Sequence, residues 1–440
     1  MRGFLTYGPG IPRYVALWLP LTPLLVAALL ALRVRRGAVA VVVASTLPTF
    51  LLHNPPGRLP FPVRWALLTA LLGGLAWWVA ARVRGGGPVD GPRPPVRWPL
   101  VLALGVVALL VRVPLAWVDP GVGDFARSSE TAARQLLAGA NPYTVPNEHT
   151  VYGIYQYPAG SLLAHLPFVA VAPRRLLAEP WVGARAALWA TEAAAVALLA
   201  WAGARLGHAR AGVAAAVAYA LGPTLVRESA IVVANDLMLA LAGTASAVAL
   251  AAGRPLAAGL LAGLAVSVKP PALLLVPLLL VAAGWRPAAL ACAVPAVLQA
   301  PFLLWPSPGL HGLVAIAEPA ARPDPYATVQ YSTWWPLYAT LGPTRPLLGV
   351  VTAAGVVAAC AAAVWAGRQL RRRGITLART AAAYALPLLV AFLGASALRT
   401  NFQDWYLPLF LLCAAVVGTT PGPAAPRHAR AVAAAGVRRG

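Results

Sequence analysis

Acidic side chains are rare in this chain, and their positions mark the segments where acid–base chemistry is available. Only 12 of the 440 residues are acidic, yet Asp119, Asp124, Glu130 and Glu148 fall within 30 positions. Asp124 follows a glycine and opens a short segment whose apolar residues recur at helical spacing. A carboxylate at such a helix start can act as an N-cap or as a general base. The two interpretations are compatible, because a capping carboxylate is already held in place.

The segment after Asp124 is expected to form a helix along the membrane surface. Gly139 predicts the end of that helix, since glycine readily adopts the left-handed conformation that closes a helix. Asn141-Pro142 then predicts a turn or extended backbone. The helix would hold its carboxylates just outside the end of the preceding apolar run.

A second acidic position follows at Asn235-Asp236, between two apolar runs. A carboxylate at the rim of a membrane span is a functional candidate, and the competing interpretation is again a helix N-cap. Lys269 is the only lysine among 35 basic residues, and it precedes Pro270-Pro271. A compact ammonium suits a phosphate as a point charge, although a lysine at a helix end can also extend its amine to the interface. Arg399 lies in a fourth polar cluster, next to Gln403, Asp404 and Tyr406.

The composition predicts an all-α polytopic membrane protein. Hydrophobic residues make up 60% of the chain and charged residues 11%. Only helices and closed barrels satisfy their backbone groups across a hydrocarbon core about 30 Å thick, which takes about 20 residues per helix. The apolar runs predict about 13 spans: 14–32, 38–52, 64–81, 98–118, 181–202, 211–232, 237–252, 256–268, 271–283, 287–305, 346–366, 380–398 and 405–418. The second of them contains Pro48, which is expected to break its helix.

Arginine placement predicts the orientation. With the N-terminus outside, the inside loops carry 20 of the 35 basic residues and a single acid, Asp90, as the positive-inside rule requires. The net charge of +23 therefore reflects membrane topology, and no nucleic-acid partner is expected. Loop 119–180 lies outside, and its apolar segment 159–173 is expected along the interface, because a crossing there would invert every later loop.

Five regions follow from this topology. Residues 1–81 form a leading three-span extension, and 82–97 form a cytoplasmic linker rich in proline, glycine and arginine. Residues 98–310 form the main transmembrane module with outer loop 119–180. Residues 311–418 hold a second outer loop and the last spans, and 419–440 form a basic, disordered cytoplasmic tail.

Familiar soluble-enzyme motifs are absent. The chain has no Walker A sequence, no Rossmann glycine fingerprint, no HExxH and no GxSxG. Its histidines and three cysteines show no ligand spacing. No cofactor is therefore expected. Use of a divalent metal ion is possible, but no residue pattern indicates a site for one.

Three stretches together resemble the GT-C superfamily of membrane glycosyltransferases, and within it the bacterial polyprenyl-phosphate-mannose-dependent α-mannosyltransferases. They are GDF…ARQLLAGANPYTV with YPAGSLLAHLPF, then GPTLVRESAIVVANDLMLAL, then VKPPALLLVPLLL; QDWYLPLF is a weaker fourth. The likeness covers residues 98–310 well and 311–418 loosely, whereas the first 97 residues match no known pattern. It implies a GT-C-like fold with interfacial helices in the first outer loop.

The resemblance also implies roles for individual residues. Asp124 would be the catalytic base toward an acceptor hydroxyl, Lys269 would bind the donor phosphate, and Asn235 and Asp236 would line the cavity for the acceptor. Arg399 is a further candidate for the phosphate, and Glu130 and Tyr143 of the first outer loop are further candidates for the cavity. The chain departs from the family at Ala234, where a histidine often stands.

The resemblance further implies the partners and the location. The donor would be a polyprenyl-phosphate sugar, most simply mannose, and the acceptor a hydroxyl of a glycolipid or glycan. The protein would be a multi-pass protein of the cell membrane with its active site on the extracytoplasmic face. The alternative is a glycolipid transporter or flippase, in which Asp236 and Lys269 would be coupling charges.

The predicted topology has a direct test. A reporter enzyme that is active only outside the cytoplasm, fused after Tyr143 or Asp324, should be active, because both positions lie in predicted outer loops. The same reporter fused after Arg373 should be silent. Activity at Arg373 would reverse the orientation and place the candidate site on the other face.

Overall fold

The computed structural model describes residues 11–52, 61–85, 96–118, 124–150, 153–173, 181–227, 229, 233–305, 334–341, 344–394 and 404–419. Over these residues the chain is helical, and they contain no strand, which confirms the all-α prediction. The helices are α1 (Ile11–Ala31), α2 (Arg36–Leu52), α3 (Phe61–Arg84), α4 (Trp98–Val118), α5 (Asp124–Leu137), α6 (Ala159–Val171), α7 (Val182–Arg205), α8 (Ala209–Leu221), α9 (Pro223–Arg227), α10 (Asp236–Ala251), α11 (Pro255–Val268), α12 (Leu275–Ala283), α13 (Trp285–Leu303), α15 (Trp335–Leu341), α16 (Arg345–Arg373), α17 (Leu377–Gly394) and α18 (Leu407–Thr419), with the 3-10 turn η2 (Pro270–Leu274) between α11 and α12.

Most helix positions agree with the sequence pattern, and two details differ. Pro48 lies inside α2 instead of ending it. The predicted span 211–232 is not one continuous helix, because α8 ends at Leu221 and the short α9 begins at Pro223. Proline lacks an N–H donor and disfavours helical backbone in the residue before it. Gly222 accordingly has extended backbone, with ψ of 116°.

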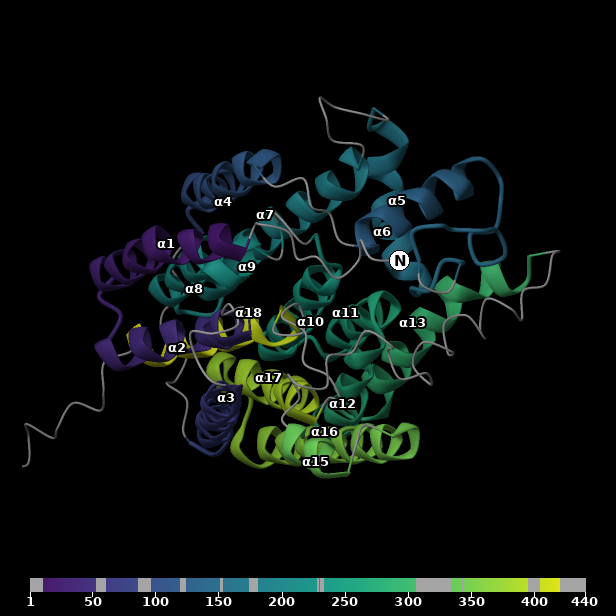
Figure 1. Ribbon diagram of the computed structural model, residues 1–440. Helices are drawn as coiled ribbons and strands as arrows, with labels where there is room; N and C mark the ends of the chain where they lie inside the picture. The colour runs from purple at the N-terminus through teal and green to yellow at the C-terminus, as the bar shows by residue number, and fades with distance from the viewer. Residues whose placement is uncertain are drawn as a thin grey trace, which may run out of the picture.

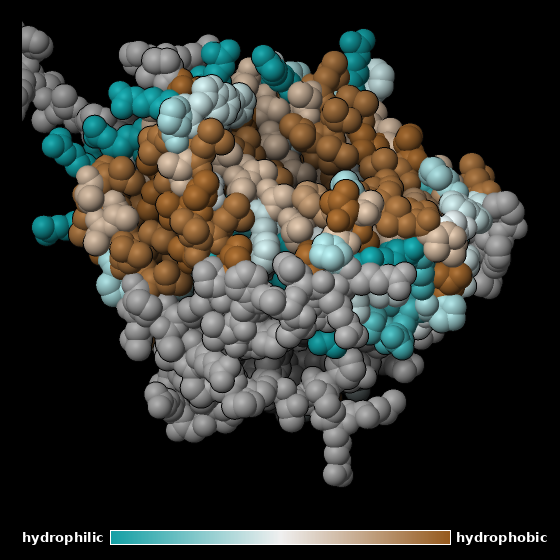
Figure 2. Space-filling view, turned by 90° about the horizontal axis from the view of Figure 1, so that it is seen from above, coloured by the Kyte–Doolittle hydropathy of each residue, from teal (hydrophilic) through white to brown (hydrophobic). Residues whose placement is uncertain are grey.

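Five helical segments are long and apolar enough to cross a membrane, counted over the described residues: Trp65–Arg84, Val182–Arg205, Trp285–Leu303, Pro346–Arg373 and Leu377–Gly394. Nine shorter apolar helical segments accompany them. Large apolar side chains are exposed at many positions, for example Trp77, Leu102 and Val357. Figure 2 shows a face on which hydrophobic residues cover most of the described surface, with hydrophilic residues toward its margins. Such a surface is typical of helices that face lipid.

The helices pack into one bundle with a smaller unit beside it. α17 and α18 are almost wholly buried, whereas α16 presents much of its apolar surface outward. α5 and α6 pack together and contact α7, α11 and α13 (Figure 1). A small separate core joins them, centred on Tyr143, Tyr155, Leu162 and Phe302. The described residues of segment 124–173 therefore sit against the bundle as a folded unit, called the first-loop unit below.

Predicted cytoplasmic ends meet at one end of the bundle. Arg373 Nη1 donates a hydrogen bond to the carbonyl oxygen of Arg84 at 2.6 Å, and Arg379 Nη2 donates one to Gly85 at 2.9 Å. The backbone N–H of Arg35 donates to the carbonyl oxygen of Gly418. These contacts join the end of α3 to the end of α16 and the start of α17, and the turn before α2 to the end of α18. Linker residues 86–95, loop residues 306–333 and tail residues 420–440 lie outside the described part of the chain.

Close helix packing depends on glycine at a few positions. Gly355 of α16 lies against Gly394 of α17, and a Cβ added at Gly355 would approach the carbonyl oxygen of Gly394 to 2.5 Å. Small residues at such crossings let helix backbones approach closely, which gives dispersion contact where lipid removes the hydrophobic driving force. Gly349, also on α16, would place a Cβ in open space.

These two glycines predict opposite effects of the same substitution. Gly355→Ala should lower the midpoint of thermal unfolding in detergent, because backbone atoms of α17 must move to admit the methyl group. Gly349→Ala is the matched control and should leave the midpoint unchanged or raise it, since alanine is favoured over glycine within a helix by about 1 kcal/mol. Equal behaviour of the two variants would show that α16 and α17 do not depend on this contact.

Candidate functional site

Asp236 and Lys269 form an ion pair at one end of the bundle. Lys269 Nζ lies 2.6 Å from Asp236 Oδ1 and 3.3 Å from Asn235 Oδ1. The Asp236 side chain is fully buried, and that of Lys269 is 16% exposed. Charges in a low-dielectric environment are costly unless they are paired and hydrogen-bonded. Three predicted site residues therefore meet in one arrangement.

The local sequence explains how these residues come together. α10 and α11 run antiparallel and are joined by a short turn after Ala251. The first residue of α10 therefore lies beside the last turn of α11. Lys269 has extended backbone, with φ of −155° and ψ of 133°, as expected for a residue that precedes a proline. The predicted break at Pro270 is thus confirmed, and it leaves the lysine at the helix end.

The N-cap interpretation for Asn235-Asp236 is only partly met. Asn235 stands at the N-cap of α10 but makes no side-chain capping bond there. Its side-chain oxygen contacts Lys269 instead. Asp236 lies in the first helical turn, where the helix dipole favours an acidic group. The pair thus combines a favourable helix position with a specific cation partner.

Trp405 completes the cluster, and the sequence analysis did not assign it to the site. Its indole Nε1 donates a hydrogen bond to Asp236 Oδ1. Lys269 Nζ lies 5.9 Å from the centroid of the Trp405 ring, within the range of a cation–π contact. Asp404, the neighbouring residue, is fully buried. Arg399 and Gln403 lie outside the described residues.

An apolar cavity of about 360 Å³ adjoins this cluster along the chain. Met238, two residues after Asp236, lines it, as do Ser267 and Val268, which precede Lys269. The remaining lining residues come from α6, α7, α10, α11 and α13: Gly160, Leu163, Ala164, Thr191, Leu241, Ala242, Leu264 and Leu298. A charged pair beside an apolar cavity is an arrangement suited to an amphipathic ligand.

The first-loop unit reaches the same place. A Cβ at Gly160, near the start of α6, would lie 2.1 Å from Ser267 Oγ, so α6 and α11 are in close contact there. Ser267 is two residues from Lys269. The structure therefore brings the predicted outer loop to the lysine, although the two are far apart in sequence.

Glu130 and Tyr143 lie inside the first-loop unit, where each has structural contacts. Glu130 Oε1 pairs with Arg134 at 2.5 Å, and Glu130 Oε2 accepts the backbone N–H of Ala184 at 3.0 Å. Glu130 thus holds α5 against the first turn of α7. The Tyr143 hydroxyl donates to the carbonyl oxygen of Tyr157 at 2.8 Å, and burial raises the pKa of Tyr143 well above its usual range. These contacts give both residues a positioning role.

Asp124 is the first residue of α5, as predicted, and its side chain lies outside the described residues. The next residue, Phe125, packs edge-on against Tyr157 and His165. His165 Nδ1 lies 2.7 Å from the carbonyl oxygen of Ser161, and burial lowers the pKa of His165 to about 4. A neutral imidazole with its proton on Nδ1 therefore packs against Phe125, the residue after the predicted base, and the sequence analysis did not single it out.

A second buried ion pair lies deeper in the helices. Arg112 of α4 and Glu192 of α7 approach to 2.7 Å, and both side chains are fully buried. The Tyr219 hydroxyl donates to Glu192 Oε1 at 2.6 Å, and Arg112 Nε donates to Ser229 Oγ at 2.8 Å. Arg112 and Glu192 each lie within an apolar run, and an ionisable residue in such a place is a functional candidate by default. The sequence analysis did not single out either residue.

Metal binding finds no support in the described part of the chain, since no group of three His, Cys, Asp or Glu side chains there could hold a metal ion.

Comparison with protein-family models, with curated proteins and with solved structures finds no match. The fold and the site therefore define the class only coarsely, as an all-helical protein with several helices suited to a membrane.

The Asp236–Lys269 pair predicts a marked effect of single substitutions. Lys269→Met removes the cation from a buried carboxylate and should cost about 3–5 kcal/mol of unfolding free energy, the usual effect of breaking a buried pair from one side. Asp236→Asn with Lys269→Met should recover much of that loss, because no uncompensated charge remains. Urea unfolding in detergent measures both.

The control is Glu148→Gln, which removes the partner of His149 in an exposed contact of 3.5 Å. This change should have little effect, as expected of surface ion pairs. A double variant no more stable than Lys269→Met alone would show that the two side chains are not energetically coupled.

Proposed function

We propose that this protein is an integral membrane glycosyltransferase. It transfers a sugar, most simply mannose, from a polyprenyl-phosphate donor to a hydroxyl of a glycolipid or glycan acceptor. The observation that carries the proposal is the Asp236–Lys269 ion pair at a helix break, next to an apolar cavity. The resemblance of three chain segments to GT-C glycosyltransferases supports the same reaction.

The donor phosphate is proposed to bind at Lys269. A compact ammonium is a point charge that suits a phosphate oxygen. Asp236, Asn235 and Trp405 each contact the amine, and a phosphate would share or replace the contact with Asp236. Arg399 is proposed as a second phosphate contact. The adjoining apolar cavity suits the hydrocarbon part of such a donor.

Asp124 is proposed as the general base. The acceptor hydroxyl oxygen attacks the anomeric carbon, and the bond from that carbon to the phosphate oxygen breaks. The phosphate leaves with the bonding electron pair, and Asp124 takes the hydroxyl proton. Lys269 stabilises the charge that develops on the departing phosphate. Asn235 and Asp236 are proposed to contact the acceptor, while Glu130 and Tyr143 hold the first-loop unit in place.

The proposal includes a topology. About 13 segments cross the cell membrane, and the helices of loop 119–180 lie along its outer interface. The cluster at Lys269 then faces the extracytoplasmic side, where lipid-linked sugars are consumed without nucleotides. The grouping of Arg84, Arg373 and Arg379 at the other end of the bundle supports this orientation.

A second candidate function is a glycolipid transporter or flippase. The fully buried Arg112–Glu192 pair favours it, because paired charges within a bundle often mark transport pathways. A transporter would move a lipid-linked sugar across the bilayer without breaking its glycosidic bond. The two functions therefore differ in whether a new covalent product forms.

Transfer is tested with protein reconstituted in vesicles and supplied with radiolabelled polyprenyl-phosphate mannose and a crude glycolipid acceptor fraction. Label should pass into glycolipid or glycan. Asp124→Asn should lower turnover by about 10² or more, the usual contribution of a general base, with normal expression because asparagine caps a helix about as well. Lys269→Ala should raise the apparent KM for the donor, and Lys269→Arg should restore it only in part.

Asp119→Asn is the matched control and should cost little. If Asp119 proves essential and Asp124 does not, the loop is correct and the base is misassigned. If labelled donor crosses the vesicle membrane intact while no labelled product forms with any lipid-linked sugar, the transporter replaces the transferase.

A further inference from the structure

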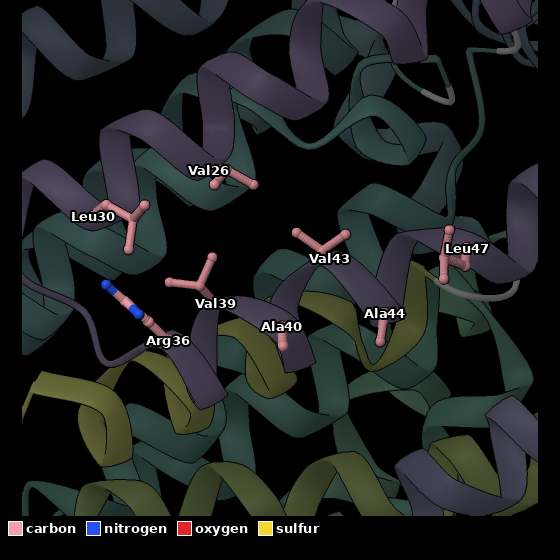
Figure 3. Close-up of a pocket in the computed structure, with 8 residues that line it drawn as sticks. All are labelled: Val26, Leu30, Arg36, Val39, Ala40, Val43, Ala44 and Leu47. Carbon is pink, nitrogen blue, oxygen red and sulfur yellow. The ribbon is translucent and has the colours of Figure 1, made fainter.

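An apolar groove with one arginine at its end lies between α1 and α2, far from the candidate site. Its volume is about 420 Å³, within the range of small-molecule sites. Val26 and Leu30 of α1 face Val39 and Val43 of α2 across it, and Arg36 stands at one end (Figure 3). Ala40, Ala44 and Leu47 complete the lining. An apolar groove with one charged group at its end suits an amphipathic ligand.

The positive charge at the Arg36 end of the groove favours an anionic ligand. Arg33, Arg35 and Arg36 are all exposed in and beside the turn between α1 and α2. Positions 1–89 of the sequence contain no acidic residue, and within the described residues no carboxylate forms an ion pair with Arg36. Clustered arginines next to a membrane helix attract anionic lipid headgroups.

The length of the groove matches one bilayer leaflet. Arg36 and Leu47 are the first and last groove residues of α2, and at 1.5 Å per residue they lie about 16 Å apart along the helix. Half of a hydrocarbon core about 30 Å thick is about 15 Å. A ligand whose headgroup meets Arg36 would therefore extend its chain to about the middle of the bilayer.

The groove is separate from the Lys269 cluster. The backbone N–H of Arg35 bonds to Gly418 at the end of α18, whereas Trp405, just before α18, bonds to Asp236. Thirteen residues of mostly helical chain separate Trp405 from Gly418, which corresponds to about 20 Å. The arginine end of the groove thus lies at the opposite end of the bundle from the candidate site.

We propose that the α1–α2 groove binds one anionic phospholipid of the leaflet that contacts Arg33, Arg35 and Arg36. The phosphate of the headgroup pairs with Arg36, and one acyl chain fills the groove along Val39, Val43 and Leu47. The lipid joins α1 and α2 where their side chains leave a gap. This site is independent of the proposed transferase activity.

Photocrosslinking tests the site directly. The full-length protein in phosphatidylcholine nanodiscs receives phosphatidylglycerol with a diazirine midway along one acyl chain, and tryptic fragments are mapped after illumination. Crosslinks should concentrate in fragments 14–33 and 37–58, which carry the groove residues of α1 and α2. The same probe on phosphatidylcholine should label these fragments several-fold less. Excess inorganic phosphate should not reduce the labelling, because the acyl chain contributes to binding.

Two variants with matched controls distinguish the contribution of the headgroup contact from that of the groove. Arg36→Gln should lower phosphatidylglycerol labelling about fivefold, since one arginine near anionic lipid contributes about 1 kcal/mol. Arg210→Gln, at an exposed arginine of α8, should change nothing. Ala40→Trp, which fills the groove, should lower labelling by both lipids, whereas Ala353→Trp on an exposed face of α16 should not.

Three results would overturn the proposal. Labelling of the wild-type protein spread evenly over all lipid-facing fragments would show that no site exists. Equal labelling by both lipids would show that Arg36 does not select an anion. Dimers in detergent that Ala40→Trp converts to monomers would assign the groove to a second copy of the chain. The first two results use only the wild-type protein, so they hold even if a variant fails to fold.

Discussion

The ion pair between Asp236 and Lys269 is the constraint on which the candidate site depends. A carboxylate and an ammonium removed from water must stay together, because separating them leaves a buried charge at high cost. In this structure the pair relies on two conditions: α10 and α11 run antiparallel, and α11 ends at Val268. The proline pair after Lys269 and the short turn between the helices meet both conditions. Trp405 then ties the start of α18 to the same point.

The bundle distributes its charges along one axis. Arginines that bond to carbonyl groups gather at the ends of α3 and α16 and the start of α17, whereas Asp236 and Asp404 are buried at the start of α10 and just before α18. Close contacts such as Gly355 with Gly394 let the helices approach without large side chains between them. Polar ends and close helix packing, with the Arg112–Glu192 charges paired inside, together give a molecule suited to a bilayer.

The two described cavities differ in the way their ligands would be held. The cavity near Lys269 adjoins a cation that is already paired, so an incoming phosphate must compete with or share a carboxylate. The α1–α2 groove ends at an exposed arginine in a segment without acidic residues, so an anion there meets less competition. The paired cation near Lys269 favours exchange of a ligand. The exposed arginine of the α1–α2 groove favours lasting binding of a lipid. The same elementary interaction can thus hold an exchanging ligand at one end of the bundle and a lasting one at the other.

The sequence by itself determined the helical class, most helix positions, the helix after Asp124 and the break at Lys269, because hydropathy, helix-capping residues and proline act within a few residues. It also singled out Asn235, Asp236 and Lys269, since scarce charges in an apolar chain stand out. Only the tertiary structure decided that Trp405 joins them, that Arg112 pairs with Glu192, and that Glu130 accepts a hydrogen bond from the first turn of α7. These contacts depend on how each helix is rotated and shifted against its neighbours. Packing over the whole bundle fixes that register, and no local pattern encodes it.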